Sequence, residues 1–230
     1  MTKLGTVDTV SMPDQFDAIE RTPGEPSGKE FTVLLAQVVG ETAMLPHAVN
    51  KNTGAAGPFQ FIKSTWLAMV RNHGAELGVK PELIQKIGVD AKGRPQIADP
   101  QALQDVLDLR HDVALSARMA SKYTKDATGM LQRLLHRPPT DTEVHLTFLL
   151  GPAGASKLIH AAANTPEIGS DQVVTAAVKA NPRLFHDASG RVRTAGEAVA
   201  FLADNYRANI VKAAIYAQVP AANPKSAIDA

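Results

Sequence analysis

Three capping boxes constrain the fold of this chain more than any other feature. The first is followed by a long apolar stripe, and the other two open apolar helices. In a capping box, a Ser or Thr side chain accepts a hydrogen bond from the backbone three residues on, and a Glu at that position reaches back. The boxes are Ser27–Glu30, Thr140–Glu143 and Thr194–Glu197. Alternation of period two is nearly absent and Ala is very common. We therefore predict an all-α fold with little or no β-sheet.

Breaks rich in Gly and Pro separate the expected helices. Helical spacing of apolar residues predicts helices over Ser64–Leu77, Pro81–Ile87, Asp99–Tyr123, Lys125–His136, 140–150, Ala155–Ala163, Asp171–Lys179 and 194–218. Loops are expected at Asn50–Gly57, Asp90–Pro100, Gly151–Gly154 and Asn181–Gly190, the last with a turn at Asp187–Gly190.

The chain is expected to form one domain with a loose segment at each end. Its 230 residues suffice for one well-packed domain. Residues 1–26 contain Pro13, Pro23, Gly24 and Pro26 among polar residues, which predicts a flexible arm. The domain is expected over 27–218, followed by a loose tail, 219–230, that is rich in Pro and Ala. We find no internal repeat and no low-complexity block.

Composition excludes several classes of function. The formal net charge of +1 is too small to predict a nucleic-acid-binding face. The absence of cysteine excludes disulfides and thiolate chemistry. No apolar run approaches the roughly 18 residues of a membrane span. Met1–Asp17 has no apolar core, so we do not expect a signal peptide, and work outside the cytoplasm would need another route of export or a trimmed sequence.

One carboxylate, Glu41, is placed where it can do acid–base chemistry. The helix expected after the first capping box carries one apolar face, made of Phe31, Leu34, Leu35, Val38 and Val39. Gly40 weakens this helix and Pro46 ends it, so Glu41 falls in its last turn at the rim of the apolar face. Burial beside apolar groups raises the pKa of a carboxyl, as a general acid requires. The alternative is a solvated residue at the end of a helix.

The sequence around Glu41 resembles the lytic transglycosylase, or goose-lysozyme-like, family of peptidoglycan-cleaving enzymes. The matching residues run from Val33 to Gly78, and they are Glu41-Thr42, Pro46-His47-Ala48, Gly54-Ala55-Ala56-Gly57-Pro58-Phe59-Gln60-Phe61 and Thr65-Trp66. A second stretch, 139–152 with Ala180–Phe185 and Asp187–Gly190, resembles the catalytic domain of phiKZ-type phage endolysins and of bacterial secretion-activator muramidases. The resemblance spans about residues 29–212 and implies a lysozyme-like catalytic domain.

The resemblance implies roles for several residues. Glu41 is the expected catalytic residue, and Thr42 stands where the family has Ser, which keeps a hydroxyl beside the acid. Gln60 is the expected amide ligand of an N-acetyl group or a sugar hydroxyl, and Phe61 and His145 are expected to line the groove. Each has a structural alternative: a surface amide for Gln60, core packing for Phe61 and a half-buried histidine for His145. For Trp66 we favour the core.

The family mechanism needs only one carboxylate. No Asp or Glu follows Glu41 until Glu76, so a nearby second catalytic carboxylate is not expected. In the family, a single Glu first acts as an acid and then as a base, and the muramyl 6-hydroxyl closes a 1,6-anhydro ring. The resemblance thus implies cleavage of the MurNAc–GlcNAc β-1,4 bond, by a transglycosylase or a muramidase.

The chain departs from its relatives on the wall opposite Glu41. The Ala-Tyr-Asn motif of common transglycosylases is absent, and phage relatives carry Tyr at the position of His145 and His at that of Phe148. A second hypothesis is therefore a helical module of a secretion or virion assembly that binds peptidoglycan without cutting it.

The remaining expectations concern ligands and location. No His pair has the spacing of a zinc motif, so we expect no metal and no cofactor. The expected partner is the peptidoglycan glycan strand, bound by a monomer, with no nucleic acid involved. Such a substrate implies the periplasm or the cell wall.

Overall fold

The computed structural model describes residues 47–51 and 53–218. The predicted N-terminal arm (1–26), the helix from Ser27 to Glu41 and the C-terminal tail (219–230) lie outside the described residues. Within them the fold is mainly α-helical, as predicted. The helices are α3 (Lys63–His73), α4 (Pro81–Ile84), α5 (Pro100–Asp108), α6 (Val113–Leu135), α7 (Asp141–Asn164), α8 (Ser170–Val173), α9 (Thr175–Ala180), α10 (Pro182–Phe185) and α11 (Ala195–Gln218). The two-residue strands β1 (Gly88–Val89) and β2 (Pro95–Gln96) pair antiparallel.

Two of the predicted capping boxes are present in the described residues. The Thr140 hydroxyl accepts a hydrogen bond from the backbone N–H of Glu143, and the backbone N–H of Thr140 donates to the Glu143 carboxylate. These two bonds cap the first turn of α7. The same exchange between Thr194 and Glu197 opens α11. Each box satisfies backbone N–H groups that the first turn of a helix would otherwise leave without acceptors. No helix of the described segments has the length and apolar character needed to span a membrane.

The expected long helix Asp99–Tyr123 is wrong, because the helical path breaks at Asp112. Asp112 is extended, with φ −72° and ψ 111°, and its carboxylate accepts from the backbone N–H of Leu115. A short 3₁₀ turn, Leu109–His111, precedes it. The helix that follows, α6, continues without a break through Lys125, where a second helix had been expected. The N-cap at Asp112 therefore sets the boundary that the apolar spacing did not mark.

The break near Gly151 is narrower than the predicted turn. Gly151 alone leaves helical geometry, with φ 65° and ψ 163°, and Pro152 starts the second half of α7. Pro fits the first turn of a helix because its missing N–H would have no partner there. Further along, the expected helix Asp171–Lys179 is divided into α8 and α9 at Val174, and the expected loop after it contains α10.

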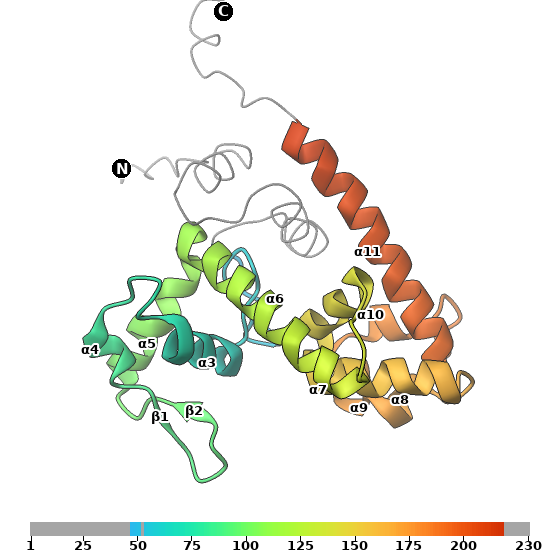
Figure 1. Cartoon of the computed structure of the whole chain (residues 1–230), viewed down its shortest axis with the longest axis horizontal. Coiled ribbons are helices and arrows are strands. Elements are labelled where there is room, and N and C mark those ends of the chain that lie inside the picture. The colour runs from blue at the N-terminus through green and yellow to red at the C-terminus, as the bar shows by residue number, and fades with distance from the viewer. Residues whose placement is uncertain (1–46, 52, 219–230) are drawn as a thin grey trace, which may run out of the picture.

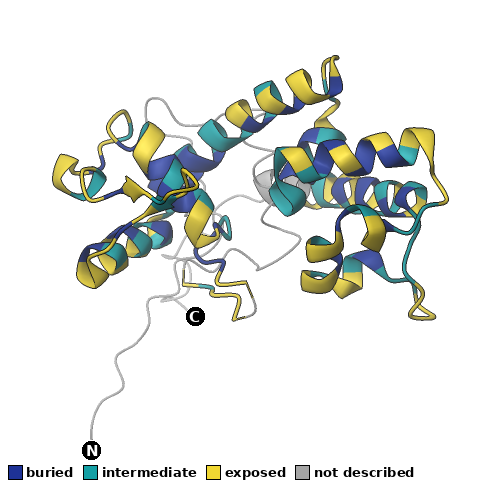
Figure 2. Ribbon diagram, turned by 90° about the horizontal axis from the view of Figure 1, so that it is seen from below, coloured by how far each residue is buried: buried dark blue, intermediate teal, exposed yellow. Residues whose placement is uncertain are grey.

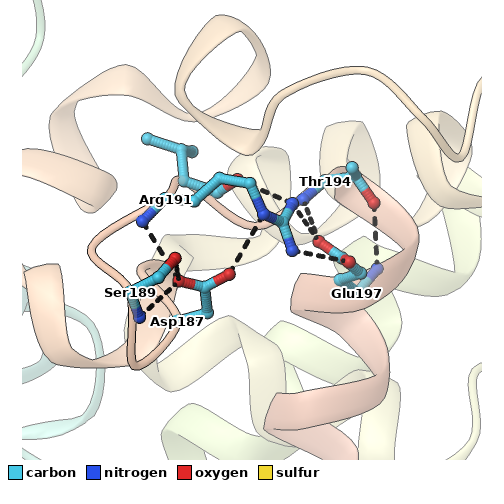
Figure 3. A network of polar contacts seen from close by, with 6 residues as sticks. Asp187, Ser189, Arg191, Thr194 and Glu197 are labelled. Atoms are coloured by element: carbon cyan, nitrogen blue, oxygen red, sulfur yellow. Dashed lines mark hydrogen bonds and ion pairs between the residues drawn. The ribbon is translucent and has the colours of Figure 1, made fainter.

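The same five-residue turn occurs twice, at Asp90–Arg94 and Asp187–Arg191. In each, the backbone N–H of the Asp donates to the carbonyl of the Arg at 2.9 Å, and a Gly at the fourth position has positive φ. One Asp oxygen accepts two backbone N–H groups, and the other binds the Arg guanidinium. Figure 3 shows that the second turn continues through Arg191 to the capping-box residues Thr194 and Glu197. This confirms the turn expected at Asp187–Gly190.

The buried side chains form two clusters joined by α6. The first cluster packs α3, α5 and the N-terminal half of α6 around Trp66, and the second packs α7 to α11 around Phe185. The 23-residue helix α6 places Leu115 and Met119 in the first cluster and Leu131 and Leu135 in the second. In Figure 1, α6 crosses between the two groups of helices, and in Figure 2 buried positions lie in both groups.

Candidate functional site

The segment that carries the Gly-rich motif folds into a short loop built by backbone pairing. We call residues 53–62 the motif loop. Ala56 forms β-bridges with both Val49 and Phe61. Backbone N–H groups of Asn50 and Phe61 donate to the carbonyls of Ala55 and Ala56 at 2.8 and 3.1 Å. The loop is therefore held by hydrogen bonds of its own backbone, although it belongs to neither helix nor sheet.

Gln60 lies at the tip of this loop in an unusual conformation. Its φ is 49°, a value that side-chain-bearing residues adopt rarely. Its backbone N–H donates to the carbonyl of Gly57 at 3.1 Å, which closes the turn. Its side-chain Nε2 donates to the carbonyls of Gly57 and Ala48 at 2.8 and 3.3 Å. Carbonyl oxygens only accept, so these two bonds fix the amide with Oε1 on the other side.

Among the described residues, the Oε1 atom of Gln60 is left as an acceptor that faces no protein donor. No described residue donates a hydrogen bond to it, and the side chain is half-buried at the surface of the cavity described below. The amide was expected to hold an N-acetyl group or a sugar hydroxyl. Its orientation suits a ligand that donates, such as a hydroxyl or an amide N–H, rather than a ligand carbonyl.

Arg110 holds the motif loop from behind. Its side chain is only 8% exposed, and Nη1 donates to the carbonyls of Gly54 and Phe61 at 3.1 Å each. Nε donates to the carbonyl of Leu107 at 2.9 Å, and Ser116 Oγ donates to the carbonyl of Arg110 at 2.7 Å. Burial lowers the pKa of the Arg110 guanidinium. The loop is thus tied to the junction between α5 and α6.

Helices α7 and α11 are joined by a pair of stacked aromatic rings. The rings of His145 and Tyr206 lie 4.4 Å apart between centroids, at 24°. Burial lowers the pKa of His145 to about 4, so this imidazole is neutral at pH 7. Burial also raises the pKa of Tyr206 to about 12, with the nearby Asp141 charge as the second cause. The stack therefore carries no charge near neutral pH.

Phe148, the second departure from the family pattern, lies one turn after His145 on α7. Its ring meets the edge of Tyr123 at 5.0 Å. Tyr123 is fixed by donating its hydroxyl to the carbonyl of Thr147 at 2.8 Å, and burial raises its pKa to about 12. Phe148 is thereby held in place at the cavity wall.

A cavity of about 430 Å³ lies between the motif loop and these helices. Aromatic and aliphatic side chains share its surface with amides. The motif loop and its neighbour contribute Asn50, Thr53, Ala55, Pro58, Phe59, Gln60 and Ile62, and α7 contributes His145, Leu146, Phe148 and Leu149. The remaining walls are formed by Asn181, Leu184, Leu202, Asn205, Ala208, Asn209 and Lys212. Mixed aromatic and amide surfaces suit a polar, uncharged ring such as a sugar.

Two of the predicted site residues, Gln60 and His145, line this cavity together although they are far apart in the sequence. Phe61 does not line it: the side chain is 6% exposed and packs on Trp66, at 5.2 Å between ring centroids. Trp66 is fully buried, as expected, and its indole N–H donates to the carbonyl of Val106 at 2.7 Å. Glu41 and Thr42 lie outside the described residues.

Sequence reasoning missed the contribution of α11 to the cavity. Asn205, Asn209 and Lys212 are spaced by four and three residues, which places them on one face of a helix. That spacing was visible in the sequence, but only the fold brings it opposite Gln60. It also missed Phe59, which takes the place in the cavity wall that was expected for Phe61.

The described cavity wall carries one cation, Lys212, and no carboxylate. No three His, Cys, Asp or Glu side chains cluster closely enough to hold a metal ion anywhere in the part of the chain that the structure describes. A scan against models of known protein families finds none that matches this chain.

Proposed function

We propose that this protein is a peptidoglycan-cleaving glycosidase, a lytic transglycosylase or muramidase that acts on the MurNAc–GlcNAc β-1,4 bond. The observation that carries the proposal is the shared cavity of Gln60 and His145. These residues come from the two stretches whose sequences resemble peptidoglycan-cleaving enzymes. If the sequence resemblance were accidental, there would be no reason for residues from both stretches to line the same cavity.

The chemistry of the cavity supports a sugar as ligand. Phe59 and Phe148 offer apolar ring surface, and Gln60, Asn181 and Asn205 offer amides. Sugars present both hydroxyls and apolar C–H faces, so both kinds of surface are useful. The Gln60 Oε1 acceptor can receive a sugar hydroxyl or the N–H of an N-acetyl group.

The catalytic acid in this proposal is Glu41. The described wall has no carboxylate of its own, and in this proposal the segment before residue 47 supplies the proton donor. The motif assigns that role to Glu41, which precedes the motif loop by about a dozen residues. Glu41 protonates the leaving oxygen and then, as a base, takes the proton of the muramyl 6-hydroxyl or of a water. The site of action would be the periplasm or cell wall.

The test compares cell-wall clearing by three proteins. Wild type and Glu82→Gln should lower the turbidity of purified cell walls, because Glu82 is an exposed residue of α4 outside the cavity. Glu41→Gln should bind the same walls without clearing them. Mass spectrometry of the products separates 1,6-anhydro ends from reducing ends, and hence transglycosylase from muramidase.

The opposite results are also informative. If Glu41→Gln still clears walls, Glu41 is not the acid. If wild type and Glu41→Gln both bind walls and neither clears them, the protein is the non-catalytic binding module instead. That second function is favoured by the absence of the Ala-Tyr-Asn motif and by His145 and Phe148, which stand where phage relatives carry Tyr and His.

A further inference from the structure

One face of α11 forms a polar wall along the cavity. It consists of Asn205, Asn209 and Lys212, with the small Ala208 between them, and we call it the α11 wall. Seven residues separate Asn205 from Lys212, which corresponds to about 10.5 Å along the helix axis. A ligand that lies along the α11 wall can therefore make polar contacts with it at more than one position.

Lys212 is the one cation of the described cavity wall, and none of the described anions pairs with it. It forms no ion pair or hydrogen bond with any residue that the structure describes. Arg207, on the same helix, pairs with Asp204, and Arg137 and Arg191 pair with Glu143 and Glu197. Because no carboxylate of the described wall offsets it, this ammonium adds positive potential to that side of the cavity.

The motif loop, on another side of the cavity, contains no anion that could pair with Lys212. The motif loop contributes Pro58, Phe59 and Ile62 as apolar surface and Gln60 as an amide. Asn209 lies one turn before Lys212 and adds an amide that can donate beside the ammonium. An ammonium next to an amide donor suits a carboxylate, which accepts through both oxygens.

We propose that the α11 wall is a specificity subsite in which Lys212, assisted by Asn209, binds a carboxylate carried by a substituent of the glycan strand. This inference rests on the proposed function. The carboxylate comes either from the peptide or, on muramyl sugars that carry no peptide, from the free lactyl group. In both cases the subsite distinguishes decorated, anionic strands from neutral polymers of the same sugars.

The experiment measures cleavage and sedimentation binding of purified cell walls before and after their carboxylates are converted to amides. Wild type should prefer the untreated walls, and Lys212→Gln should reduce that preference about two- to fivefold, as for an exposed charge pair. Lys212→Arg keeps the charge and should keep the preference. Lys157→Gln, an exposed cation of α7 outside the cavity, is the matched control and should behave as wild type.

Two further arms identify the source of the carboxylate and the nature of the effect. Removing the peptides by hydrolysis of their amide bond frees the lactyl carboxylate of each muramyl sugar. The stripped walls, compared with and without amidation, keep or strengthen the preference if the lactyl carboxylate is bound, and they lose it if the peptide supplies the anion. Raising the salt from about 0.1 M to about 1 M shortens the Debye length from about 10 Å to about 3 Å and should weaken the preference.

Three results would overturn the proposal. They are an equal preference in wild type and Lys212→Gln, no preference in wild type, and a loss of preference that Lys157→Gln reproduces. Failure of the proposed function is seen separately, because wild type would then cut walls of neither kind, whether or not it binds them. Thermal unfolding of Lys212→Gln distinguishes a lost contact from a lost fold.

Discussion

The backbone of Gly57 lies directly against the carbonyl of Arg110. A Cβ added at position 57 would come within 2.0 Å of that oxygen, and φ there is +77°. Gly57→Ala therefore meets both a clash with backbone and a strained dihedral, and we expect a loss of about 2–5 kcal/mol in the free energy of unfolding.

Gly54→Ala is the matched control for Gly57→Ala. Gly54 also has positive φ, +69°, but a Cβ added there would meet no other described segment within 4 Å. It should lose only the dihedral strain, about 1 kcal/mol. Chemical denaturation measures both variants, and equal losses would show that the contact with Arg110 does not constrain the loop.

Arg110 should contribute more to the free energy of unfolding than an exposed arginine does. Arg110→Met removes the side-chain donor to the carbonyls of Gly54, Phe61 and Leu107, and we expect a loss of about 2–4 kcal/mol. The carbonyls of Phe61 and Leu107 each keep one backbone N–H donor. Arg94→Met removes an exposed guanidinium that pairs with Asp90, and its effect should be smaller. Denaturation in urea measures both, and an Arg94 variant at least as unstable as the Arg110 variant would contradict this account.

At position 60, Gly should be less destabilising than Ala, which is the reverse of their order inside a helix. Ala and Gly both remove the amide, but only Gly adopts φ near 49° without strain. Gln60→Gly should therefore be more stable than Gln60→Ala, by about 1 kcal/mol, whereas in a helix the order is reversed. Both variants should bind cell walls more weakly than wild type, because both lose Oε1. Thermal unfolding and sedimentation binding measure the two effects separately.

The pH dependence of stability should carry a contribution from His145. Its pKa is lowered to about 4 in the folded state and has the ordinary value of about 6.5 when unfolded. Between these values the unfolded state binds more protons, so the free energy of unfolding falls as the pH falls from about 6.5 to about 4. The contribution, up to roughly 3 kcal/mol, is complete above about pH 6.5.

His145→Phe tests this assignment. Phe can keep the stack on Tyr206 but cannot take up a proton. The difference in stability between wild type and His145→Phe should therefore vary with pH in that window and be constant above it. A constant difference from about pH 4 to about pH 8 would assign the pH dependence to other groups.

The helical fold could be predicted because its signals are local. The Thr140 and Thr194 caps follow from residues three apart, and apolar spacing locates α3 and α11. The break at Asp112 was missed because apolar residues continue with helical spacing on both sides of it, so a single capping carboxylate decides the boundary.

The candidate site was predictable only in part. Motif residues identified Gln60 and His145, but no local pattern says which of two neighbouring aromatics faces a cavity. Phe61 packs on Trp66 in the core, whereas Phe59 lines the cavity. The α11 wall depends on a tertiary contact between distant segments, which the spacing along one helix does not determine.

Helix α6 should couple the unfolding of the two buried clusters. Since it supplies Leu115 and Met119 to one cluster and Leu131 and Leu135 to the other, neither cluster can melt without exposing part of the same helix. The two halves should thus behave as one cooperative unit. Amide protons in the middle of α6 should exchange at the rate set by global unfolding, and those of β1 and β2 much sooner.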